Sequence, residues 1–89
     1  MLYVVVEKFR HGAKPVYERA STHGRMLPAG LTYLDSWIDS NLTRCFQLME
    51  TEDPELLCEW ISSWNDLVEF EIVSVITSSE AAQKVAEKA

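Results

Sequence analysis

The sequence predicts one α+β domain of the βαββαβ plait type, followed by a helix over residues 78–88. The length of 89 residues suits one domain with a single core. Segments rich in β-branched and aromatic residues alternate with segments of helical periodicity, in the order strand, helix, strand, strand, helix, strand, helix. No repeat, linker or low-complexity segment interrupts this order, so we expect residues 1–89 to form a single ferredoxin-like domain.

The first half of the chain begins with a predicted strand over residues 2–8, where β-branched and aromatic side chains dominate. A helix follows, because Pro15 suits a first helical turn and Gly24 is a typical helix terminator. A hairpin is then indicated by two apolar segments, residues 31–39 and 43–50, on either side of the polar corner Ser40-Asn41. Apolar or half-polar side chains fall at helical spacing within the helix: Val16, Tyr17, Ala20 and His23.

The second half opens with a strong helix start at Asp53-Pro54-Glu55, which combines a capping aspartate, an early proline and an acidic first turn. Residues 68–77 read as the fourth strand. Thr77 and Glu80 have the spacing of a capping box, which predicts the last helix. The apolar stripe of the second helix is formed by Leu56, Leu57, Trp60, Ile61 and Trp64.

The predicted sheet carries apolar side chains on both faces. Val4 and Val6 point to one face of the first strand, while Tyr3 and Val5 point to the other. Two helices cover only one face, so we predict a homodimer joined through a sheet face, since a two-fold contact needs a single self-complementary surface. The alternative is that long strands carry scattered surface hydrophobes. The hairpin divides similarly, with Tyr33, Trp37, Phe46 and Leu48 on one face and Leu34, Ile38, Cys45 and Met49 on the other.

Composition excludes several functions. The net charge of −6 disfavours nucleic acid and anionic membranes as partners, and residues 44–50 lack the aromatic and basic pattern of an RNA-binding strand. The two cysteines have no zinc-ligand spacing, and no glycine-rich phosphate loop is present, so we predict neither a metal nor a cofactor. The cysteine usage and an opening segment unlike a signal peptide make a cytoplasmic location the expectation.

Four segments carry a resemblance to a known family: residues 2–6, 30–37, 44–50 and 60–71. The last contains a W-x-D-L-x-x-F-E stretch from Trp64 to Glu71. Together they resemble the dimeric α+β barrel superfamily, and within it the small bacterial domain-of-unknown-function 3303 group. The resemblance implies a ferredoxin-like protomer whose sheet pairs with a second copy to form a barrel. The superfamily includes cofactor-free monooxygenases, isomerases and dehalogenases, but this group supplies no catalytic residues to carry over.

The hairpin offers one candidate for an anion-binding site. Pairing Ile38 with Thr43 places Trp37 opposite Arg44 and Asp35 opposite Phe46. Arg44 then contacts the Trp37 ring and reaches Asp35. In this arrangement Arg44 either holds an anionic ligand such as a carboxylate or simply fixes the strand register. On the opposite face the same register pairs Ser36 with Cys45 and Leu34 with Gln47, either beside a ligand or within a dimer interface.

The helices supply the remaining candidates. Trp60 and Trp64 are core residues that would also line a pocket between helix and sheet, together with Tyr33 or Trp37. His23 is a weak candidate for acid–base catalysis, because the helix dipole also explains a histidine in a last turn.

Three functions remain compatible with this sequence. The first is a homodimer that binds a small apolar or anionic ligand in a cleft between sheet and helices. The second is a cofactor-independent monooxygenase- or isomerase-like enzyme acting on a small aromatic substrate, as the resemblance suggests. The third is an interaction domain that uses its sheet for assembly and has no pocket.

Overall fold

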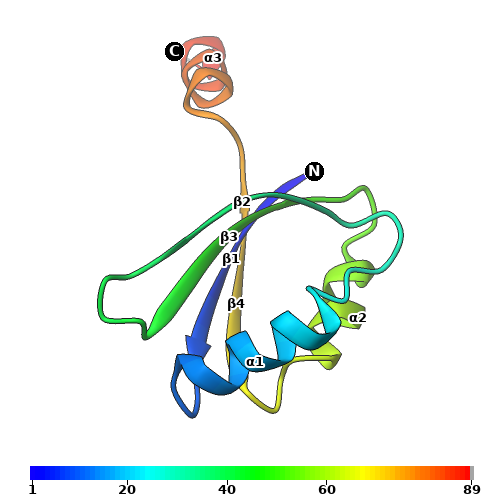
Figure 1. Ribbon diagram of the computed structural model, residues 1–89. Coiled ribbons are helices and arrows are strands. Elements are labelled where there is room, and N and C mark those ends of the chain that lie inside the picture. The colour runs from blue at the N-terminus through cyan, green and yellow to red at the C-terminus, as the bar shows by residue number, and fades with distance from the viewer. Residues whose placement is uncertain (89) are drawn as a thin grey trace.

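The computed structural model describes residues 1–88 and confirms the predicted βαββαβ plait with a C-terminal helix (Figure 1). The order follows from local signals that were visible in the sequence. Gly24 ends the first helix with a φ of 65°, a backbone conformation that favours glycine, and its N–H donates to the carbonyl of Ala20. Asp53 Oδ1 accepts a hydrogen bond of 3.0 Å from the N–H of Glu55 at the start of the second helix. The elements are β1 (Leu2–Phe9), α1 (Ala13–His23), β2 (Thr32–Ile38), β3 (Arg44–Glu50), α2 (Glu55–Ser62), β4 (Val68–Val75) and α3 (Ser78–Lys88).

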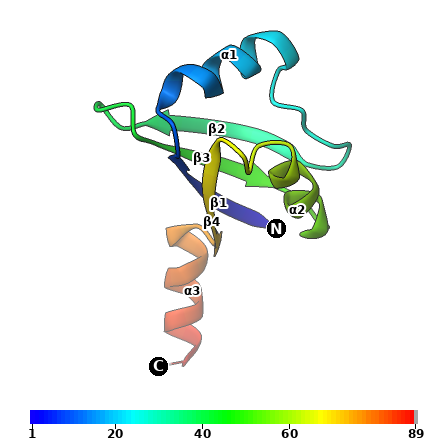
Figure 2. The same cartoon turned by 90° about the horizontal axis from the view of Figure 1, so that it is seen from below.

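The four strands form one antiparallel sheet in the order β2-β3-β1-β4, with β1 and β3 at its centre. Helices α1 and α2 both lie against one face (Figures 1 and 2). The other face, which we call the outer face, has no helix over it in either view. Its apolar side chains are Leu2, Val4, Val6, Trp37, Phe46, Leu48, Val73 and Val75.

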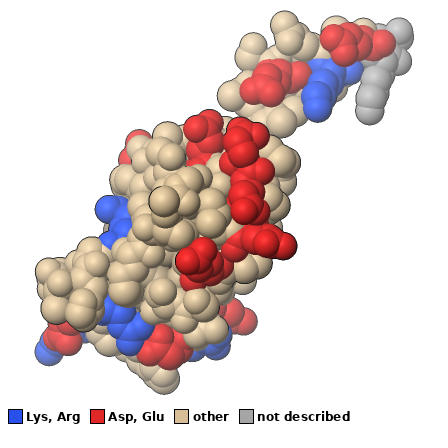
Figure 3. All heavy atoms as spheres, turned by 90° about the vertical axis from the view of Figure 1, so that its right-hand side faces the viewer, with Lys and Arg blue, Asp and Glu red and all other residues tan. Residues whose placement is uncertain are grey.

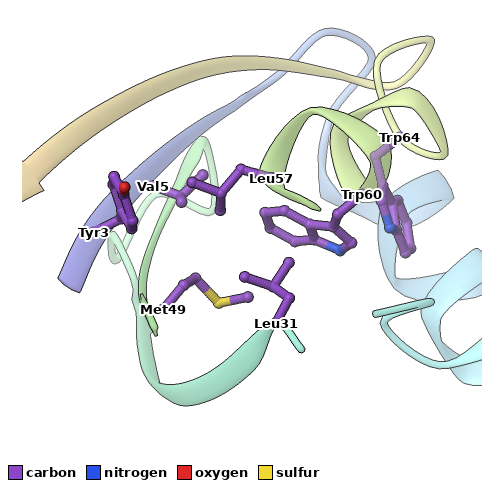
Figure 4. Close-up of a cluster of buried hydrophobic side chains, with 7 residues drawn as sticks. All are labelled: Tyr3, Val5, Leu31, Met49, Leu57, Trp60 and Trp64. Atoms are coloured by element: carbon purple, nitrogen blue, oxygen red, sulfur yellow. The ribbon is translucent and has the colours of Figure 1, made fainter. Parts of the chain in front are cut away.

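The core lies between the sheet and α2 (Figure 4). Alternate residues of β1 point inward, so Tyr3 and Val5 are buried while their neighbours are half-buried. Trp60 of α2 packs edge-on against Phe70 of β4, with ring centroids 5.6 Å apart. The cluster of buried residues is Tyr3, Val5, Leu31, Met49, Leu57, Trp60 and Trp64.

The hairpin departs from the predicted register. Trp37 pairs with Phe46 rather than Arg44, and Asp35 pairs with Leu48 rather than Phe46. The connection is longer than the predicted two-residue corner, because the Asp39 carboxylate accepts hydrogen bonds from the N–H groups of Thr43 and Arg44 and closes a five-residue loop over residues 39–43. The predicted pairs of Ile38 with Thr43, Ser36 with Cys45 and Leu34 with Gln47 are wrong for the same reason.

A β-bulge adds a second correction. The register shifts between Tyr33 and Asp35, which leaves Leu34 as the extra residue. Tyr33 therefore faces the helices beside Met49, whereas Trp37 points to the outer face. The prediction that Tyr33 and Trp37 share a face is wrong, because a single unpaired residue reverses the alternation along a strand.

Helix α3 projects beyond the body of the domain after β4 (Figures 1 and 2). The N–H of Glu80 donates to Thr77 Oγ1 at 3.1 Å, as the capping pattern predicted. Val85 on this helix is 70% exposed. Figure 3 shows the same projection, together with a band of acidic side chains across the face seen there. Across residues 1–88, no helix combines the length and the apolar character that crossing a membrane requires.

Candidate functional site

A cleft of about 190 Å³ lies between the sheet and the two helices α1 and α2. The sheet provides its floor, and the helices with the segment after α1 provide its walls. Both walls are held together by Arg19, whose guanidinium makes two hydrogen bonds of 2.7 and 2.8 Å to the Asp66 carboxylate beyond α2. The cleft is lined by Glu7, Phe9, Val16, Tyr17, Ala20, Gly24, Arg25, Ser36, Cys45, Gln47, Trp60 and Trp64.

Two polar side chains at the floor are almost completely buried. Glu7 is 5% exposed and Gln47 is 7% exposed, although both lie on central strands of the sheet. They come together because Gln47 pairs with Val5 and Glu7 pairs with Cys45 across β1 and β3, which makes Glu7 and Gln47 diagonal neighbours. Gln47 Nε2 donates a hydrogen bond to Glu7 Oε2.

Burial governs the charge state of the floor. Loss of hydration raises the pKa of Glu7 from 4.5 to about 7, against smaller opposing effects of the Gln47 hydrogen bond and the positive charge of Arg25. Burial also raises the pKa of the Cys45 thiol to about 11, with a further contribution from the Glu7 charge. Near neutral pH, therefore, Cys45 is an uncharged thiol and Glu7 exchanges readily between its two protonation states.

Gln47 keeps one polar atom without a partner. Its Oε1 is buried, and no hydrogen bond reaches it from the residues that the structure describes. An unsatisfied buried amide oxygen costs on the order of 1–3 kcal/mol, so native proteins usually pair such an atom. Because Gln47 lines the cleft, an unpaired acceptor lies at its floor beside a titratable carboxyl group.

The mouth of the cleft is formed by Arg25 and its neighbours. The carbonyl oxygen of Arg25 accepts hydrogen bonds of 2.9 and 3.0 Å from the indole N–H groups of Trp60 and Trp64, which fixes the segment after α1 against α2. The Arg25 guanidinium lies 3.6 Å from the centre of the Tyr33 ring. The Tyr33 hydroxyl in turn makes a 2.6 Å hydrogen bond with Ser36.

The structure brings together only part of the predicted site. Trp60 and Trp64 line the cleft, and Tyr33 lies behind Ser36 at its edge. Trp37 and Arg44 instead belong to the outer face, where Trp37 is 57% exposed and Arg44 lies over Phe46 at 5.3 Å. The predicted pairing of Arg44 directly opposite Trp37 is wrong, because the register places Phe46 opposite Trp37.

His23 occupies the last turn of α1 and is exposed. The cleft is lined by Ala20, Gly24 and Arg25 on either side of it, but not by His23 itself. The acid–base group nearest to the cleft is therefore Glu7 rather than this histidine.

Sequence reasoning missed Glu7, Arg25 and Tyr17 as site residues. A signal for Glu7 was present, because it follows Tyr3 and Val5 at the alternate positions of β1 and so shares their inward face. A charged residue on an inward face is unusual enough to be a candidate for function. Arg25 follows the end of α1 in an irregular segment, where no periodic pattern predicts its direction.

The arrangement is suited to recognition by hydrogen bonding inside an apolar cleft. Carboxyl, amide, hydroxyl and thiol groups lie on the floor, while valine, alanine and tryptophan side chains form the walls. Within residues 1–88, no group of three or more His, Cys, Asp and Glu side chains is placed to hold a metal ion.

Comparison with known proteins gives a family but no described activity. The family model described as "Domain of unknown function (DUF3303)" matches residues 1–89, the full length of the chain. No curated protein and no solved structure matches. Because the match spans every element from β1 to α3, the chain belongs to the DUF3303 family.

Proposed function

We propose that this domain binds a small molecule in the cleft between its sheet and helices, and that it does so as a homodimer joined through the outer face. The observation that supports binding is the buried pair of Glu7 and Gln47 at the floor of an apolar cleft. A side chain that served only to fill the core would be apolar at these central positions. Burying a carboxyl group there lowers stability, which natural proteins accept mainly at functional sites.

The size of the cleft limits the ligand. A volume of about 190 Å³ is somewhat larger than an apolar cavity of roughly 150 Å³ that accommodates benzene. The cleft therefore fits a molecule with one ring and few substituents. A broader hollow of about 680 Å³ at the Lys8 end of the sheet is a weaker candidate, because exposed charged side chains such as Arg44, Glu69 and Glu71 surround it.

Filling the cleft tests the binding proposal. Ala20 of α1 lines the cleft and is half-buried, so Ala20→Leu adds three carbon atoms at its wall. We expect this variant to lose binding of one-ring fragments that raise the melting temperature of the unaltered protein. Ser21→Leu is the matched control, because Ser21 is the exposed neighbour on the same helix and lies outside the cleft. Equal fragment binding by the unaltered protein and the Ala20→Leu variant would contradict the cleft as the site.

The outer face supports the homodimer. Eight apolar side chains lie there with no helix over them, and the exposed fractions of Trp37 and Val73 are 57% and 41%. A continuous apolar surface of this kind on an isolated domain favours association. A second copy is the simplest occupant, because one self-complementary surface is sufficient for a two-fold contact.

The charges along β3 favour the same occupant. Arg44 and Glu50 lie at opposite ends of the strand on the outer face, each three residues from Gln47, with Phe46 and Leu48 between them. A two-fold axis that crosses β3 at Gln47 therefore brings Arg44 over Glu50 of the second copy, and Phe46 over Leu48. Two ion pairs then enclose an apolar centre, as expected for the rim and core of an interface.

A further inference from the structure

We propose that the ligand of the cleft is an uncharged one-ring molecule with a hydroxyl or N–H group, and that this group donates a hydrogen bond to Gln47 Oε1. The inference rests on the proposed function and gives the chemical class of its ligand. The ligand class is inferred from the hydrogen-bonding groups at the floor of the cleft, because some of these groups already have partners and one does not.

When Glu7 is ionised, the Gln47 amide group is oriented by its hydrogen bond to that carboxylate. Its Nε2 donates to Glu7, and no hydrogen bond from residues 1–88 reaches its Oε1. Ser36, which pairs with Gln47 across β2 and β3, already shares its hydroxyl group with Tyr33. The other cross-strand neighbour, Val5, has no donor in its side chain. A ligand donor is therefore the partner that completes the hydrogen bonding of Oε1.

The charge of the floor disfavours an anion. A ligand bound beside Gln47 also lies close to Glu7. Burial destabilises the negative charge of Glu7 and raises its pKa to about 7, so a second negative charge beside it is disfavoured. The net charge of −6 repels anions from the molecule as a whole. Arg25 is the cation that lines the cleft, but it lies over the Tyr33 ring at the mouth. An anionic group would be attracted to Arg25 and would leave Gln47 Oε1 unpaired.

Protonation of Glu7 is linked to this selectivity. The charged or titratable groups around the carboxyl group are Arg25 from the segment after α1, Tyr17 from α1 and Cys45 from β3, while Trp60 of α2 and Trp64 just after it contribute no charge. When Glu7 is ionised, it accepts from the Gln47 amide group and Oε1 is free. When Glu7 is protonated, its hydroxyl can donate to that oxygen after the amide turns over, which removes the free acceptor. Binding of a donor ligand is therefore tightest when Glu7 is ionised.

Three probes of one ring each test the inference: phenol has a donor, toluene has none, and benzoate is an anion. Binding is measured by NMR titration at about pH 8, where Glu7 is mostly ionised. We expect phenol to bind about tenfold more tightly than toluene, because only phenol pairs with the buried oxygen. We expect benzoate to bind more weakly than phenol. Gln47→Met keeps the length of the side chain but removes the acceptor, so phenol binding should fall to the level of toluene.

The outcomes separate the inference from the proposed function. Equal binding of phenol and toluene by the unaltered chain, or tighter binding of benzoate, overturns the inference while the binding cleft stands; neither comparison requires a variant to fold. A preference for phenol that survives in a folded Gln47→Met protein also overturns it. If none of the three probes binds in a manner that Ala20→Leu abolishes, both the inference and the proposed function fail.

Discussion

Replacing Glu7 with glutamine is expected to stabilise the domain at about pH 8 by on the order of 3 kcal/mol. In the folded protein the pKa of Glu7 is about 7, against 4.5 for a solvated glutamate. Ionising this carboxyl group therefore costs more free energy in the folded state than in the unfolded state. The Glu7→Gln substitution removes that cost while keeping the shape of the side chain and an acceptor for Gln47 Nε2.

The pH dependence gives the sign of the effect. Between pH 4.5 and about 7 the folded state binds more protons at Glu7 than the unfolded state, so the stability of the unaltered protein falls as pH rises through this range. The Glu7→Gln variant lacks this decline. Hydrogen bonds from Arg19 lower the pKa of Asp66 from 3.8 to about 2. The stability that ionised Asp66 contributes is therefore lost as pH falls from 3.8 to about 2, which lies below the range from pH 4.5 to about 7 in which Glu7 acts.

Urea unfolding of both proteins at a series of pH values, at one fixed protein concentration, measures this difference. The two stability curves should converge near pH 4.5 and separate as pH rises toward 7. Curves that remain parallel over the same range would show that Glu7 ionises as freely in the folded protein as in the unfolded chain.

Reversing the charge at either end of β3 is expected to separate the two copies of the homodimer. In the proposed two-fold contact, Arg44→Glu places a negative charge against Glu50 of the second copy at two symmetric positions. Arg44→Glu and Glu50→Arg should each weaken dimerisation by at least about tenfold, because like charges then face each other at the edge of a desolvated surface. The double variant Arg44→Glu with Glu50→Arg restores opposite charges and should recover dimerisation.

Sedimentation over a range of protein concentrations measures the effect, since the chain has a mass of 10.2 kDa and its dimer twice that mass. Lys14→Glu is the matched control, because it makes the same change of charge on an exposed position of α1. If the double variant stays as dissociated as the two single variants, Arg44 does not face Glu50 and the proposed two-fold axis is wrong.

The order of the elements was predictable because each is specified by local chemistry. Gly24 and Asp53 mark helix ends through hydrogen bonds to neighbouring backbone atoms, and Thr77 does so for α3. The hairpin register was not predictable in the same way. It depends on the Asp39 side chain closing a five-residue loop and on one unpaired residue, Leu34, and neither leaves a trace in the alternation of apolar residues.

The sequence indicated the cleft in two places: at the core, and on the sheet face of Ser36, Cys45 and Gln47, which we expected either beside a ligand or within a dimer interface. Trp60 and Trp64 line the cleft because both belong to the buried cluster that forms one side of it. Trp37 and Arg44 were assigned with them since the sequence does not state which face of the sheet the helices cover. Glu7 and Gln47 become neighbours only through pairing between β1 and β3, strands separated by more than thirty residues of chain.

The three tryptophans report separately on the cleft and on the outer face, because each indole N–H gives its own NMR signal. Trp60 and Trp64 lie at the cleft, and Trp37 lies on the outer face. Titration with phenol should shift the signals of Trp60 and Trp64 and leave that of Trp37 in place, whereas dilution of the unliganded protein should shift Trp37 alone. Phenol-dependent movement of Trp37 without movement of Trp60 or Trp64 would contradict a ligand site between the sheet and the helices.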